Sequence, residues 1–181
     1  MKAIRHLYEE HGAENYYRDH ADSYANPHFP QIAALLQDNL GHINHAGGVL
    51  DFCAGGGEVS LALAALGVGN ITGCDPFTYD LYEKNTGRPC LRYSFKDVIK
   101  GAALGQYSTI ICSFAMHLCP AKDLFSLCWQ LFQAAPQIVI ITPHKRPELD
   151  QIPGIRLVRE DSAFTEKEKR VRLRIYERSD G

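Results

Sequence analysis

The sequence lacks a long hydrophobic run. No apolar stretch in its 181 residues approaches the roughly 20 residues that a helix needs to cross a bilayer. The first residues, MKAIRHLYEEHGAENYY, are too polar for a secretory signal peptide. We therefore expect a cytoplasmic protein that makes no use of a membrane.

The sequence also lacks an excess of positive charge. It has 19 Lys and Arg against 21 Asp and Glu, which gives a formal net charge of -2. A protein that binds nucleic acid by neutralising phosphates is usually basic. The composition thus argues against nucleic acid as a partner, although a local basic patch is compatible with a neutral total.

Paired cysteines are absent as well. None of the six cysteines belongs to a Cys-x-x-Cys pair, and no Cys/His cluster has the short spacings of a zinc site. We expect reduced thiols in apolar surroundings and no metal. There are no internal repeats and no linker rich in Pro, Gly or Ser, so residues 1–181 are predicted to form one domain. Its parts are an N-terminal extension over 1–30 and a core over 31–181.

The chain does have a regular alternation of predicted strands and helices. Short buried strands are predicted at 49–53, 71–74, 90–94, 108–114 and 138–142, and helices at 31–40, 58–66, 79–84, 96–105 and 123–134. Two more strands, 155–159 and 170–178, follow each other directly. This order predicts an α/β three-layer sandwich, with a mostly parallel sheet and an antiparallel pair at one edge.

The last predicted strand alternates apolar residues with arginines. Such a period of two predicts one buried face and one solvated face that carries the arginines. The alternative is that these arginines form a docking patch for an anionic substrate or RNA.

A glycine turn between a strand and a helix is the strongest motif. In VLDFCAGGGEVSLALA (49–64), Gly55 and Gly57 lack a Cβ, so a ligand can approach their backbone closely. The unsatisfied N–H groups of the following helix can also bind a ligand. A turn of this kind fits either a nucleotide-like cofactor or a purely structural connection.

An acidic residue at the end of the second strand favours the cofactor interpretation. Asp75 lies 20 residues beyond Gly55, where a doubly wound sheet opens its ligand crevice. A carboxylate there can accept hydrogen bonds from a ribose diol. Alternatively, Asp75 forms a turn or caps a helix before Pro76.

Two features argue against a dinucleotide. The third glycine of a GxGxxG pattern is replaced by Ser60. Asp51, at the end of the first strand, would repel a pyrophosphate but attract the ammonium group of an amino acid.

With these residues the sequence resembles the class I S-adenosylmethionine-dependent methyltransferases of small-molecule type. Asp51-Phe52-Cys53-Ala54-Gly55-Gly56-Gly57 matches their first motif, with Cys53 in place of the first glycine. The resemblance implies a seven-stranded sheet of order 3-2-1-4-5-7-6 with an antiparallel last strand. It also implies S-adenosylmethionine as cofactor and a small molecule as methyl acceptor.

The resemblance assigns roles to individual positions. The cofactor-binding residues that it implies are Asp51, Cys53, Ala54, Gly55 and Gly57 for the amino-acid end, Asp75 with the adjacent Pro76 for the ribose, Asp97 for the adenine, and Ser113 and Phe114 after strand four.

Candidate catalytic residues are His117, Tyr16 and Tyr24. Histidine accepts protons near neutral pH, and His117 and His144 both follow predicted strands. The tyrosines belong to a predicted lid over 1–30 that would turn an aromatic face toward the sulfonium. The alternative for each is ordinary packing. The rival functions are an RNA or protein methyltransferase, a non-catalytic cofactor-binding subunit and a nicotinamide enzyme; the oligomeric state is not predicted.

Overall fold

The computed structural model describes residues 26–179. Tyr16, Tyr24 and most of the predicted lid lie outside the described residues. The strands are β1 Val49–Phe52, β2 Ile71–Cys74, β3 Cys90–Leu91, β4 Thr109–Ser113, β5 Gln137–Thr142, β6 Ile155–Phe164 and β7 Arg170–Arg178. The helices are α2 Phe29–Asn39, α3 Glu58–Ala65, α4 Tyr79–Thr86, α5 Phe95–Ile99 and α6 Leu124–Ala134. Short 3-10 turns are η2 Leu40–His42, η3 Met116–Leu118, η4 Ala121–Asp123 and η5 Leu149–Gln151.

The seven strands form one sheet in the order β3-β2-β1-β4-β5-β7-β6, as predicted. β1 pairs in parallel with β2 and β4 at the centre of the sheet. β7 runs antiparallel to both β5 and β6. The carboxyl ends of the central strands therefore meet at one edge, where an α/β sheet places its ligand crevice.

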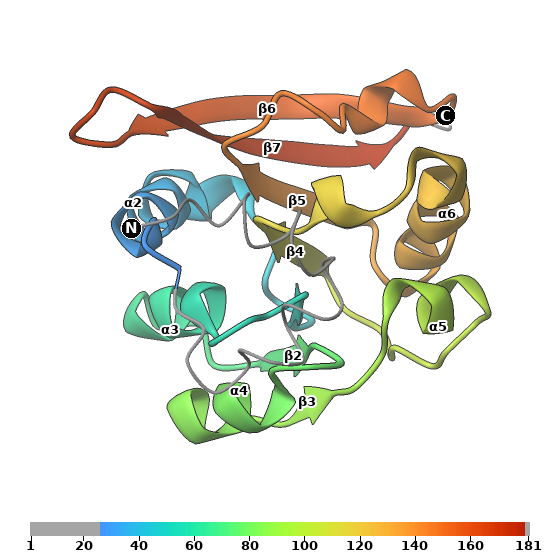
Figure 1. Cartoon of the computed structure of the whole chain (residues 1–181), viewed down its shortest axis with the longest axis horizontal. Helices are drawn as coiled ribbons and strands as arrows, with labels where there is room; N and C mark the ends of the chain where they lie inside the picture. The colour runs from blue at the N-terminus through green and yellow to red at the C-terminus, as the bar shows by residue number, and fades with distance from the viewer. Residues whose placement is uncertain (1–25, 180–181) are drawn as a thin grey trace, which may run out of the picture.

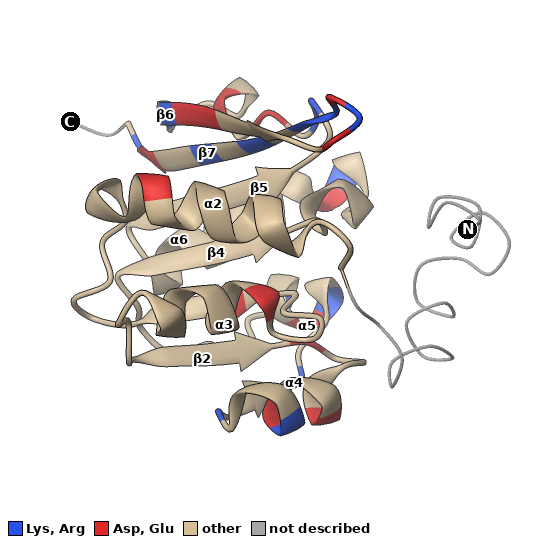
Figure 2. Ribbon diagram, turned by 90° about the vertical axis from the view of Figure 1, so that its left-hand side faces the viewer, with Lys and Arg blue, Asp and Glu red and all other residues tan. Residues whose placement is uncertain are grey.

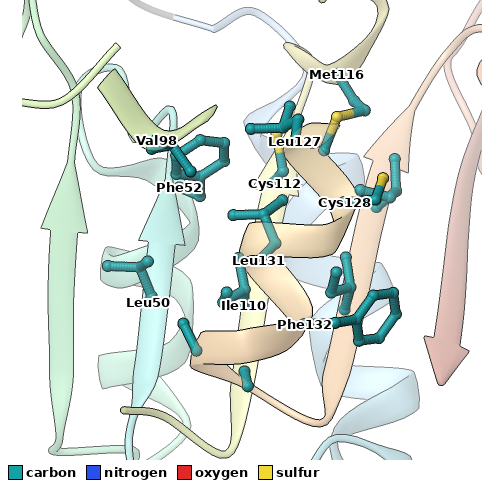
Figure 3. Close-up of a cluster of buried hydrophobic side chains, with 14 of the residues drawn as sticks. Leu50, Phe52, Val98, Ile110, Cys112, Met116, Leu127, Cys128, Leu131 and Phe132 are labelled. Atoms are coloured by element: carbon teal, nitrogen blue, oxygen red, sulfur yellow. The ribbon is translucent and has the colours of Figure 1, made fainter. Parts of the chain in front are cut away.

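Helices cover both faces of the sheet. α2 and α3 lie over one face and α5 and α6 over the other (Figures 1 and 2). Because successive strand residues point to opposite faces, Leu50 and Phe52 of β1 pack toward α6 residues such as Leu131 (Figure 3). The intervening Asp51 points toward α3 instead.

Several elements differ from their predicted bounds, the fourth helix and the sixth strand most. The helix predicted over 96–105 ends at Ile99, and Gly101 follows it with a φ of +97°. β6 runs on to Phe164, because its residues continue to pair with β7. The segment 143–154 between β5 and β6 holds only η5.

The arginine face of β7 was predicted to be solvated, and this is wrong for Arg174. Its side chain is buried, and it donates to Glu160 at 2.9 Å and to the Lys145 carbonyl at 2.7 Å. The reason is that Glu160 of β6 and the segment after β5 cover this side chain, which donates to both. No helix within residues 26–179 is long and apolar enough to cross a membrane.

Candidate functional site

The turn after β1 adopts the left-handed backbone conformation that glycine favours. Gly55 and Gly57 have φ angles of +58° and +91°, and Cys53 has a φ of +57°. A non-glycine residue in this region is strained. Cys53 therefore follows the backbone path of the glycine that it replaces. Contact with Cys112 and burial hold the pKa of the Cys53 thiol well above its usual range, so the thiol is uncharged at neutral pH.

Asp51 is fully buried beneath this turn. Its Oδ2 atom accepts from the Ser60 N–H at 3.1 Å and from the Ser60 hydroxyl at 2.7 Å, and so caps the first turn of α3. Its Oδ1 atom is buried and has no hydrogen-bond partner among the described residues. Burial raises the pKa of Asp51 to about 8, and the nearby Glu58 and Asp75 carboxylates add to the rise.

A polar chain connects Asp51 to helix α4. Ser60 donates its hydroxyl proton to Asp51, so the Tyr82 hydroxyl, 2.8 Å away, donates to Ser60. The Tyr82 ring lies directly over Gly73 of β2, where an added Cβ would come within 2.5 Å of ring atoms. Gly73 is thus needed so that Tyr82 can reach Ser60.

Both carboxylate oxygens of Asp75 accept hydrogen bonds from backbone N–H groups. Oδ2 accepts from the Gly55 N–H at 3.1 Å, and Oδ1 accepts from the N–H groups of Phe77 and Thr78, both at 2.9 Å. A carboxylate offers about four acceptor positions. Of the alternatives that the sequence left open, Asp75 thus forms the turn before α4, whose N-cap is Thr78, and roughly one acceptor position remains for a ligand.

A cavity of about 410 Å³ opens beside these groups, a size that suits a small ligand. Five residues predicted from the sequence line it: Cys53, Gly55, Asp75, Pro76 and Ser113. The prediction missed further lining residues, among them Phe77, Tyr93, Ser94, Phe95 and Leu118. Apart from Ser94 these are apolar or aromatic, a character that could equally have indicated core packing.

The remaining predicted cofactor residues do not line this cavity. Ala54 is buried and Gly57 begins α3, so both shape the turn behind the cavity. Asp97 forms a capping box with Ser94 at the start of α5: each side chain accepts from the other's backbone N–H. The Ser-x-x-Asp spacing was the signal for this local role. The hydrogen bonds to Ser94 lower the pKa of Asp97.

His117 lines a second cavity, of about 800 Å³, that adjoins the first. Leu118 and Pro120 line both cavities. The rings of His117 and His144 lie 4.3 Å apart. His117 retains solvent contact, but the protein around its ring and the charge of His144 lower its pKa to about 4. The ring is therefore neutral at physiological pH.

The first residues that the structure describes lie beside the glycine turn. The backbone N–H of Asn26 donates to the Glu58 carboxylate at 3.1 Å. The His28 ring stacks on Phe114, which follows β4 with a φ of +56°. Burial raises the pKa of Glu58. Three carboxyl groups, those of Asp51, Glu58 and Asp75, thus lie around the turn, and a nearby cation would stabilise the charged form of each. No group of three or more potential metal ligands occurs in the described part of the chain.

Comparisons with known proteins agree with this fold. No protein-family model matches the chain. A Schizosaccharomyces pombe protein, described as uncharacterized protein C17A5.05c, is 30% identical, with 76% of this chain and 74% of the relative covered. Magnesium protoporphyrin IX methyltransferase from Synechocystis PCC 6803, crystallised with bound SAM, has a TM-score of 0.66 at 17% identity, covering 97% of this chain and 95% of the other. A putative RNA methyltransferase, PH1948 from Pyrococcus horikoshii, has a TM-score of 0.58 at 14% identity, covering 81% of each chain.

Proposed function

The chain belongs to the same family as the fission yeast protein C17A5.05c and has the class I methyltransferase fold, and from this we propose that it transfers a methyl group from S-adenosylmethionine to a small molecule. The observation that carries the proposal is the buried Oδ1 atom of Asp51, which has no partner within residues 26–179. A buried carboxylate oxygen without a partner is costly. A ligand ammonium group would supply the missing partner.

The charges of the site fit S-adenosylmethionine and oppose a dinucleotide. Asp51, Glu58 and Asp75 interact with one another through their charges. With a pKa of about 8, Asp51 is largely protonated at neutral pH when no ligand is bound. A ligand that brings an ammonium and a sulfonium group favours its ionised form, whereas a pyrophosphate would disfavour that form further. When bound, S-adenosylmethionine supplies an electrophilic methyl group.

We assign the chain's own residues as follows. Asp51 and the turn through Gly55 and Gly57 hold the amino-acid end, and the fixed left-handed turn keeps the approach to the backbone open. Asp75 accepts from one ribose hydroxyl rather than two, since three backbone N–H groups already occupy its oxygens. The segment from Ser113 to His117 faces the acceptor; Ser113 is the last residue of β4, and Phe114 follows it. A neutral His117 ring can accept a hydrogen bond there.

An RNA acceptor is the second candidate, because the putative RNA methyltransferase PH1948 shares the fold. The net charge of -2 favours a small molecule. A non-catalytic cofactor-binding subunit is the third. Detection of S-adenosylhomocysteine, formed from S-adenosylmethionine with a metabolite extract or with RNA, distinguishes the three.

Calorimetry tests the cofactor directly. We expect S-adenosylmethionine and S-adenosylhomocysteine to bind and NAD not to bind. Asp51→Asn should weaken the binding of both S-adenosyl compounds by roughly 10- to 100-fold, because it removes a charge-assisted hydrogen bond of about 1.5–3 kcal/mol. Asp38→Asn, which removes an exposed charge on α2, is the matched control and should leave affinity unchanged. Tight NAD binding without binding of either S-adenosyl compound would refute the proposal.

A further inference from the structure

The 800 Å³ cavity beside the cofactor site carries cationic groups on one wall. This wall is the segment after β5, where Lys145, Arg146 and Glu148 line the cavity. The opposite wall is formed by η3 and η4 with the residues between them, and it is mostly apolar apart from His117. A ligand held here would lie next to the cofactor cavity, because Leu118 and Pro120 line both.

Two arginines of β7, the buried Arg174 and the half-buried Arg172, hold the cationic segment in place. Arg174 donates to the Lys145 carbonyl at 2.7 Å, and Arg172 donates to the Pro143 carbonyl at 3.2 Å. The backbone that carries Lys145 and Arg146 is therefore fixed at two points. A cationic side chain on an anchored backbone loses less freedom when it binds a ligand.

Arg174 interacts with two carboxylates, Glu160 and Glu148. Glu160 accepts from Arg174 at 2.9 Å. Burial acts to lower the pKa of Arg174, but the hydrogen bond to Glu160 and the charges of Glu160 and Glu148 raise it overall. Lys145 and Arg146 are exposed to the cavity side and neither forms an ion pair in the described part of the chain.

We propose that this cavity binds a methyl acceptor that carries a carboxylate or phosphate group, and that Lys145 and Arg146 recognise this group. The inference rests on the proposed methyltransferase function for the role of the ligand, but the anion site itself does not. The cofactor cavity is lined by Asp75 and Asp123 against Lys96, and the second cavity by Lys145 and Arg146 against Glu148, so the net charges of the two linings are opposite. The first cavity then takes the cationic cofactor, and the second takes the anionic acceptor. A small molecule fits better than RNA, because the cationic wall is limited to one short segment and Glu148 stands within it.

The experiment is an NMR titration of the ¹⁵N-labelled protein, with and without saturating S-adenosylhomocysteine. The probes are benzoate, phenyl phosphate and the neutral benzamide. We expect benzoate or phenyl phosphate to shift the amide signals of 116–121 and 145–151, and benzamide to bind at least about tenfold more weakly. The stronger of the two anions identifies the recognised group.

Variants and a third ligand complete the test. The double variant Lys145→Gln/Arg146→Gln should lose at least about tenfold in anion affinity. The matched control Lys84→Gln/Lys100→Gln removes two exposed charges outside both cavities and should bind as the wild type does. Equal affinity for benzoate and benzamide, no anion binding, or an unaffected double variant would each overturn the proposal. So would an RNA oligonucleotide that binds the same residues more tightly than either small anion. If the anions bind but S-adenosylhomocysteine does not, the anion site stands and the proposed methyltransferase function fails.

Discussion

The Ser60 hydroxyl donates to one carboxylate oxygen of Asp51 at 2.7 Å, while the other oxygen of Asp51 is buried without a partner in the part of the chain that the structure describes. The two oxygens of one carboxylate thus have different roles. One caps α3 and fixes the orientation of the side chain. The other is buried and has no hydrogen-bond partner among residues 26–179.

The titration of Asp51 makes stability depend on pH. Its pKa is about 8 in the folded protein against 3.8 as the ordinary value, so the folded state binds this proton more tightly. The resulting stabilisation is complete below pH 4, falls as pH rises, and is lost above pH 8. We expect the melting temperature of the ligand-free wild type to fall relative to that of Asp51→Asn between pH 5 and pH 9. Parallel curves for the two proteins would show that Asp51 titrates normally.

Asp75→Ala should impair both folding and cofactor binding. It leaves three backbone N–H groups without their acceptor, at a cost of about 1–3 kcal/mol or more in the free energy of unfolding. Loss of one ribose contact should weaken the binding of S-adenosylhomocysteine by about tenfold. Asp75→Asn should be intermediate, since its single oxygen can serve Phe77 and Thr78 while its amide faces the Gly55 N–H. Thermal melts and calorimetry measure the two effects. A lowered melting temperature with unchanged affinity would place the cofactor elsewhere.

Gly73→Ala should disturb the polar chain that leads to Asp51. The new Cβ would come within 2.5 Å of the Tyr82 ring, which is fully buried and has little room to move. We expect a loss of about 1–3 kcal/mol in the free energy of unfolding by denaturant titration. Gly69→Ala is the control, because its Cβ would meet nothing within 4 Å. Equal stability of the two variants would contradict the packing described here.

Cys53→Gly should be tolerated. Glycine adopts a φ of +57° without strain, and this gain offsets its greater freedom in the unfolded chain, so stability should stay within about 1 kcal/mol of the wild type. Affinity for S-adenosylhomocysteine should be retained. Cys53→Val places a β-branched side chain at the same φ and should be clearly destabilised. If Val is tolerated as well as Gly, the turn is not held in this conformation.

Deletion of residues 1–25 tests the predicted lid. The first residues that the structure describes after this segment lie beside the site: Asn26 contacts Glu58, and His28 contacts Phe114. We expect the truncated protein to bind S-adenosylhomocysteine almost as the wild type does but to turn over an identified acceptor more slowly. A calorimetric titration and a rate measurement on the same sample separate the two effects. Full activity after truncation would rule out the lid.

The sequence by itself determined the order of the elements and the positions of the two key carboxylates. Periodicity, glycine placement and strand length are local properties, so they indicated that Asp51 and Asp75 end neighbouring strands and that a tight turn lies between them. The resemblance to a methyltransferase motif then supplied the strand order, which the sheet confirms.

Only the tertiary structure decided what each polar group has left to offer. Asp75 lies near the predicted crevice, but the N–H of Gly55 and the adjacent N–H groups of Phe77 and Thr78 take most of its acceptor positions. Arg174 is buried against Glu160 and the segment after β5, and it anchors the loop that carries Lys145. The contacts of Asp75 with Gly55 and of Arg174 with Lys145 join segments far apart in the chain. Local sequence patterns cannot reveal them, because a side chain's hydrogen-bonding capacity is divided among neighbours that only folding brings together.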